Sequence, residues 1–240
     1  MRYARGLSVV AIGALAAGAH AAIMPPDLDG FDIQIESELG MWTSIENPDA
    51  IAQVNPLEKP GQYTIIGGAT GDGFISSWEI DVDTDPFVVS SFNITNTQAT
   101  AQVFTVTVLL PIVPQLPISS GIGSVSGSLL DSNDSGASFV GTIAGVPLYE
   151  AIIDGSTVMT LYDDPYSLAI GTPTANLPTA DFGPSVFPGA SSLIGVRNTF
   201  VLSPGDTFQA VSYFFINAVP TPGALALFGV AGVTVMRRRR

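Results

Sequence analysis

The stretch FISSWEIDV, residues 74–82, alternates between apolar and polar side chains and decides the fold class. Successive side chains of a β-strand point to opposite faces, so this pattern predicts a strand with one buried face and one solvated face. The predicted buried face carries Phe74, Trp78, Ile80 and Val82, and the predicted solvated face carries Glu79 and Asp81.

Similar runs rich in Val, Ile, Thr and Phe follow along the chain, separated by many of its 25 glycines and 18 prolines. They predict further strands at 31–39, 62–66, 87–95, 102–110, 125–130, 138–143, 148–153, 157–161, 192–202 and 207–217. No sustained helical period interrupts them. The body is therefore predicted to be all-β, an antiparallel β-sandwich of jelly-roll-like type, with a closed barrel as the alternative.

Residues 163–192 contain five prolines and several glycines and predict a long irregular connection. It could link two lobes, but only two strong strands follow it. We expect a single sandwich whose last strands return to the sheets.

Charge and cysteine content exclude several classes of function. The chain has no cysteine, which excludes disulfides, thiolate zinc sites and cysteine nucleophiles. Between the two ends only Lys59 and Arg197 are basic, against all 21 acidic residues. A body of net charge near −19 repels phosphate backbones, so nucleic acid is not expected as a partner.

Residues 1–21 have the layout of a secretory signal peptide. Arg2 and Arg5 precede an apolar run at 6–17, and Ala19-His20-Ala21 supplies the small residues of a signal peptidase site. Cleavage after Ala21 would remove the only histidine, so a Ser-His-Asp triad is not expected in the exported chain.

The last residues combine a proline motif, an uncharged run and a basic cluster. Val219, Pro220, Thr221, Pro222 and Gly223 precede an uncharged run that ends at Met236 and is followed by Arg237, Arg238, Arg239 and Arg240. As a helix, residues 223–236 would span about 21 Å. Arginines can snorkel to the interface and favour the cytoplasmic side, so we expect a short transmembrane helix.

This tail, residues 219–240, resembles the PEP-CTERM sorting signal, which also carries the description ice-binding protein C-terminal. Thr221 stands where the family motif has glutamate. The resemblance implies export, transient membrane anchoring, and processing near Pro220 and Pro222 by an exosortase-type enzyme. The protein would then be released or attached at the cell envelope. Residues 83–88, 93–97 and 104–111 also resemble stretches of the extracellular domains that precede such tails. This leaves 22–218 as the exported domain.

Acidic residues alternate at Asp81, Asp83 and Asp85, and this spacing raises the possibility of calcium, which prefers oxygen ligands. The EF-hand pattern fails, because Pro86 and Phe92 occupy its sixth and twelfth positions. The alternative is that Asp81 and Asp83 are solvated residues at a strand end, before a turn at Asp85-Pro86. Asp27, Asp29 and Asp32 are a second set of acidic residues that are either calcium ligands or solvated side chains.

The segment Tyr162-Asp163-Asp164-Pro165-Tyr166 is the candidate ligand loop. Its tyrosines could stack on sugar rings while its carboxylates accept hydroxyl hydrogen bonds or hold calcium. The alternative is an acidic turn whose tyrosines cover the end of the sandwich.

No catalytic residues are expected. Glu36 and Glu38 would lie about 7 Å apart on one strand, a glycosidase-like separation, but on its polar face. Arg197 is expected to point outward, and Thr105 and Thr107 are too few for an ice-binding face. The sequence thus predicts a structural or adhesive, non-enzymatic protein without a required cofactor. The alternative is a carbohydrate-binding module that acts on polysaccharide, with or without calcium; a hydrolase ranks last.

Overall fold

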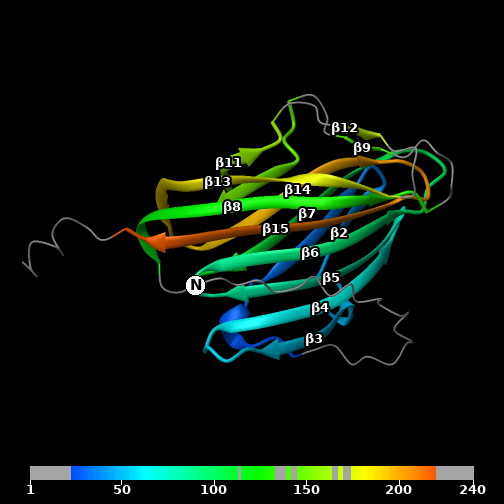
Figure 1. The fold of residues 1–240 in the computed structure, drawn as a ribbon. Coiled ribbons are helices and arrows are strands. Elements are labelled where there is room, and N and C mark those ends of the chain that lie inside the picture. The colour runs from blue at the N-terminus through cyan, green and yellow to red at the C-terminus, as the bar shows by residue number, and fades with distance from the viewer. Residues whose placement is uncertain are drawn as a thin grey trace, which may run out of the picture.

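The computed structural model describes residues 23–112, 115–132, 139–141, 145–163, 167–169 and 174–219. Two antiparallel β-sheets face each other across one apolar core (Figure 1). The helical elements of the described residues are two 3-10 turns, η1 (Pro26–Leu28) and η2 (Pro48–Ala50). The prediction of an all-β antiparallel sandwich is confirmed, and the barrel alternative is wrong. The expected signal and tail helices lie outside the described residues.

Sheet A contains eight strands and sheet B seven. Sheet A runs in the order β11 (Ser156–Leu161), β10 (Tyr149–Ile153), β14 (Leu193–Leu202), β7 (Gln102–Pro111), β1 (Asp32–Ser37) and β2 (Gly40–Thr43). In addition, β9 (Phe139–Gly141) pairs with β14, and β12 (Ser167–Ala169) pairs with β9. Sheet B runs β13 (Thr174–Ala190), β8 (Leu116–Leu130), β15 (Thr207–Ala218), β6 (Phe87–Asn96), β5 (Phe74–Asp83), β4 (Gln62–Gly71) and β3 (Ile51–Pro56).

The pairing from β6 to β15 is nested. β6 pairs with β15, β7 with β14, β8 with β13, β9 with β12 and β10 with β11, in every case antiparallel. This half of the chain is therefore one long two-stranded ribbon. Its β6–β15 and β8–β13 pairs belong to sheet B, and its β7–β14, β9–β12 and β10–β11 pairs belong to sheet A.

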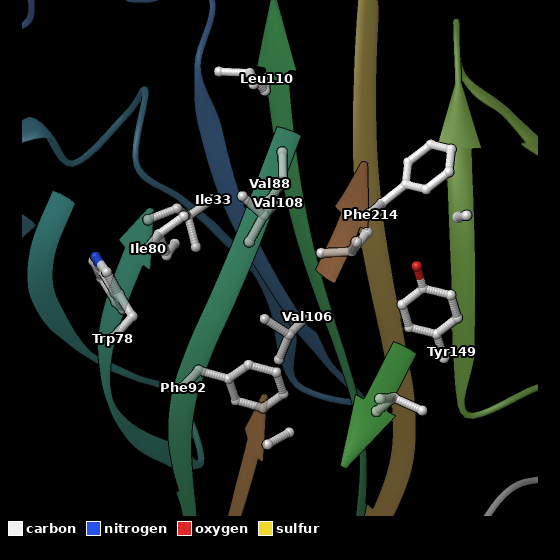
Figure 2. Close-up of a cluster of buried hydrophobic side chains, with 14 of the residues drawn as sticks. Ile33, Trp78, Ile80, Val88, Phe92, Val106, Val108, Leu110, Tyr149 and Phe214 are labelled. Atoms are coloured by element: carbon white, nitrogen blue, oxygen red, sulfur yellow. The ribbon is translucent and has the colours of Figure 1, made fainter. Parts of the chain in front are cut away.

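The alternation of FISSWEIDV holds in β5. Phe74, Trp78, Ile80 and Val82 are buried, Glu79 is exposed and Asp81 is half-buried. Figure 2 shows Trp78 and Ile80 from sheet B in the same core as Ile33, Val106 and Val108 from sheet A. The core therefore forms between the inward faces of both sheets, as period-two burial requires.

The prediction of an irregular connection at 163–192 is wrong from Thr174 to Ala190, where the chain forms β13 at the edge of sheet B. The register of β13 against β8 shifts between Leu177 and Ala180 and again between Phe182 and Ser185. Pro178 and Pro184 fall within these two bulges. An edge strand with bulges accommodates proline, because the missing N–H is not needed by a second neighbour.

Several other strands differ from prediction: β2 and β12 were not predicted, and β4 extends to Gly71, beyond the strand expected at 62–66. The strand expected at 31–39 ends at Ser37, so Glu38 lies in the turn before β2, and β3 was not predicted. β8 begins at Leu116 rather than near 125. Glycines in its first part are typical of turns in the sequence, but in the structure they allow close packing. A Cβ on Gly123 would lie only 2.5 Å from both the Phe182 ring and the Tyr149 hydroxyl oxygen, so no larger residue fits there.

Asp154 and Gly155 form the two-residue turn between β10 and β11, both with positive φ. The Asp154 carboxylate accepts hydrogen bonds of 2.8–3.1 Å from Ser191, Ser192 and Leu193. Burial by itself would raise the pKa of this carboxyl, but the backbone N–H groups and serine hydroxyls outweigh it and hold the pKa well below its usual value. The contact ties the hairpin to the start of β14.

Replacing Asp154 with asparagine is expected to lower the free energy of unfolding by about 1 kcal/mol near pH 7, a figure reduced for the exposure of the site. Asparagine keeps the turn, because Asn-Gly also favours positive φ at both positions. A carboxyl whose pKa is lowered by folding stabilises fully above its unfolded pKa, near 4, and loses this contribution as the pH falls toward the folded value. Urea unfolding at several pH values measures the difference, and a penalty that is the same at pH 7 and pH 2.5 would contradict the assignment.

Candidate functional site

The outer face of sheet A carries an open groove of about 400 Å³. Its lining comes from strands β1, β2, β7, β10 and β14 together with the segment before β10. The lining residues are Gln34, Glu36, Met41, Val103, Thr105, Thr107, Val146, Glu150, Arg197 and Thr199. We call this set the sheet A groove.

Strand register arranges most of the lining in two rows that cross the strands. The first row reads Gln34, Thr107, Arg197 and Glu150, and the second reads Met41, Glu36, Thr105 and Thr199. Side chains on one face of a strand are two residues apart, so the rows lie about 7 Å from each other. Residues far apart in the sequence therefore form one continuous surface.

Arg197 is held in place in the first row. Its guanidinium lies 3.3 Å from the Glu150 carboxylate, and its Nε donates to the Thr107 hydroxyl at 3.4 Å. Thr157 donates to the other Glu150 oxygen at 2.6 Å. Arg197 points outward as predicted, but Glu150 neutralises its charge, so the groove offers no unpaired cation.

The second row offers free hydrogen-bonding capacity. The hydroxyl oxygens of the half-buried Thr105 and the buried Thr199 lie 3.2 Å apart and share one hydrogen bond, which leaves Thr105 with hydrogen-bonding capacity toward the groove. Glu36 is exposed and forms no ion pair with any described residue. The predicted pair of Glu36 and Glu38 is not on one strand face, because Glu38 belongs to the turn.

The acidic triplet lies at the end of β5 and just beyond it, and Lys59 joins two of its members, because its Nζ lies 2.8 Å from Asp83 and 3.5 Å from Asp85. Asp81 accepts a 2.6 Å hydrogen bond from Thr64, and Asp83 accepts bonds of 2.8 and 2.7 Å from Lys59 and Gln62. The hydrogen bond to Asp83 raises the pKa of Lys59. Across the described ranges no three His, Cys, Asp or Glu side chains gather as a metal site. The calcium prediction for Asp81, Asp83 and Asp85 gains no support from this arrangement.

Asp83 itself corrects one interpretation of the sequence. It is not a solvated strand-end residue, because only 1% of its surface is exposed. The strand ends beneath the loop that carries Gly61, whose carbonyl accepts the N–H of Thr84, and Asp83 also accepts the N–H of Asp85. The carboxylate therefore organises two turns and an ion pair.

The acids near the predicted start of the exported chain also have structural partners. Asp27 accepts a hydrogen bond from the Tyr63 hydroxyl, and the buried Asp32 accepts one from Ser44 at 2.9 Å. Asp29 is exposed beside them.

The predicted ligand loop is described only as far as Asp163. Tyr162 is half-buried, packs against the core and donates its hydroxyl hydrogen to the Pro178 carbonyl. Asp163 is exposed, whereas Asp164 and Tyr166 lie outside the described residues. Tyr162 thus contacts β13, which fits the alternative that it covers the sandwich.

Sequence reasoning missed the sheet A groove. Arg197 was predicted to point outward, and Thr105 and Thr107 to share one strand face, but nothing in the sequence brought Glu36, Thr199 and Glu150 beside them. The missing signal is strand order, which a single sequence does not contain.

Comparisons with known proteins do not assign the chain to a family. No protein-family model matches the chain, and no curated protein matches it. In the part of the chain that the structure describes, no helix is long and apolar enough to cross a membrane.

Proposed function

We propose that this chain is an exported, non-enzymatic protein of the cell envelope or extracellular matrix, sorted and processed through its PEP-CTERM-like tail. Signal peptidase and an exosortase-type enzyme would be its processing partners, and the tail helix would anchor it in the membrane before cleavage. The observation that carries the proposal is that every described strand and every residue of the described core lies between Met24 and Ala218. The two routing segments can therefore be removed without removing a described strand.

The positions of the two ends support this order of events. Asp27 contacts Tyr63 at the start of β4, and the N–H of Val219 donates to Ile118 at the start of β8. These strand starts lie at the same end of sheet B, where β15 also ends (Figure 1). An anchor at this end would leave the side faces and the opposite end of the sandwich exposed to other envelope components.

We also propose that the sandwich winds in a jelly-roll-like way. The nested pairing, in which β6 to β10 pair in turn with β15 back to β11, supports this winding. A structural or adhesive role is supported by the acidic surface, which keeps the domain soluble and can bridge matrix components through divalent ions.

The second candidate is a carbohydrate-binding module. The sheet A groove favours it, because ligand sites are concave surfaces that combine apolar area with a few directed polar groups. A calcium requirement stays a prediction, which a chelator in the binding assay tests.

Substituting all four of Arg237, Arg238, Arg239 and Arg240 with alanine tests the sorting proposal. We expect the unsubstituted protein in the envelope or medium with its tail removed, and the alanine variant with its tail uncleaved, because the basic cluster no longer holds the span in place. Intact-mass measurement after cell fractionation gives the result. The matched control replaces the arginines with lysines and should be processed normally; normal processing of the alanine variant would contradict the proposal.

A further inference from the structure

We infer that the sheet A groove binds a neutral polysaccharide chain, whose hydroxyl groups are hydrogen-bonded by Glu36 and Thr105 at the middle of the groove. This inference rests on the proposed extracellular role and names the ligand class and the surface that the adhesive function would use.

The groove has a suitable size and openness. Small-molecule sites usually have volumes of about 300–1,000 Å³, and the sheet A groove, at about 400 Å³, lies in this range. It is open to solvent and its lining comes from several strands, so one segment of a polymer can lie across it. A closed pocket would instead select a small free ligand.

The chemistry of the lining matches sugar hydroxyls. A hydroxyl group both donates and accepts, and the groove presents both kinds of partner. Carboxylate oxygens accept, the Gln34 amide and the Arg197 guanidinium donate, and the hydroxyl of the half-buried Thr105 does either, whereas Thr107 and Thr199 are buried. Met41, 64% exposed, lies beside them with Val103 and Val146, which gives apolar area for the C–H faces of sugar rings.

The charge of the groove selects neutral rather than anionic chains. Arg197 is already paired with Glu150, and Glu36 adds an uncompensated negative charge. The excess of acidic residues over the whole body adds repulsion at longer range. A uronate polymer would therefore bring carboxylates toward a surface that has no unpaired cation among its lining residues.

Affinity electrophoresis of the processed protein tests the inference. The probes are soluble galactomannan, xyloglucan and mixed-linkage β-glucan, with alginate as the anionic polymer. We expect at least one neutral polysaccharide to retard the protein and alginate to have no effect. The double substitution Glu36→Ala with Thr105→Val should weaken retardation at least about tenfold, since it removes two hydrogen-bonding groups.

Sheet B supplies a matched control. Glu79 is exposed on β5, and Thr95 on β6 shares a hydroxyl hydrogen bond with Thr207 at 2.7 Å, as Thr105 does with Thr199. Glu79→Ala with Thr95→Val therefore makes the same chemical change on the opposite outer face and should leave retardation unchanged. Glu36→Ala alone, at an exposed position, should weaken retardation severalfold without unfolding the sandwich.

Four results would overturn the inference. They are no retardation by any of the neutral probes, stronger retardation by alginate, an unchanged double variant, or equal loss in the sheet B control. Failure of binding is separate from failure of the proposed sorting, because the latter is measured by the mass and location of the chain in cells.

Discussion

Phe200→Ala is expected to lower the free energy of unfolding by about 3–5 kcal/mol, the largest effect we predict for a single substitution. Phe200 is fully buried, and its ring centroid lies 4.7 Å from that of Phe208, 6.0 Å from Phe104 and 6.1 Å from Phe92. Phe104 and Phe200 belong to sheet A, and Phe92 and Phe208 to sheet B. Truncation therefore removes ring contacts across the sandwich and leaves a cavity that paired strands cannot close.

Chemical denaturation followed by tryptophan fluorescence measures this effect, since Trp78 is buried in the same core. Val186→Ala is the control, because Val186 is 74% exposed and its truncation should change the unfolding free energy by less than about 0.5 kcal/mol. If Phe200→Ala proved as mild as the control, the packing of the two sheets described here would be incorrect.

Gly67→Ala is expected to destabilise by about 2–3 kcal/mol, although it adds only one methyl group. An ideal Cβ at Gly67 would lie 2.8 Å from the Trp78 ring and closer still to the backbone carbonyl of Ala50. The ring is buried and the carbonyl belongs to the backbone at η2, so neither can move aside without disturbing β3 or the core.

The matched control for this prediction is Gly183→Ala. Gly183 lies in β13, and a Cβ there would meet no atom within 4 Å. The same chemical change should therefore leave the thermal unfolding midpoint unchanged or raise it slightly. If the Gly67→Ala protein had the same thermal unfolding midpoint as the Gly183→Ala protein, β4 would not approach Ala50 as closely as described.

The fold class was predictable because one face of most strands is buried. In β5, β6 and β7 buried and more exposed positions largely alternate, and the buried ones are mostly apolar, so period-two patterning fixed both the strands and their faces. Buried polar residues such as Ser76, Ser90 and Asn96 are the exceptions. The pattern fails where backbone geometry changes the period. The bulges of β13 shift its phase at Pro178 and Pro184, and the small residues of β8 are selected by close packing rather than by hydrophobicity.

The candidate site was less predictable, for a different physical reason. Glu36 and Thr105 face each other only because β1 pairs with β7, and Thr199 joins them only because β14 lies on the other side of β7. These neighbours are separated by tens of residues in the chain. Adjacent positions such as Tyr162 and Asp163 looked more like a site because they are close in sequence, yet Tyr162 is engaged with Pro178.

Mass spectrometry of both ends of the protein, recovered after cell fractionation, tests the proposed function most directly. We predict an amino terminus at Ala22 and a carboxyl terminus near Pro220–Pro222, found in the envelope or the medium. Recovery of a chain from the cytoplasm that still begins at Met1 and ends at Arg240 would contradict the account.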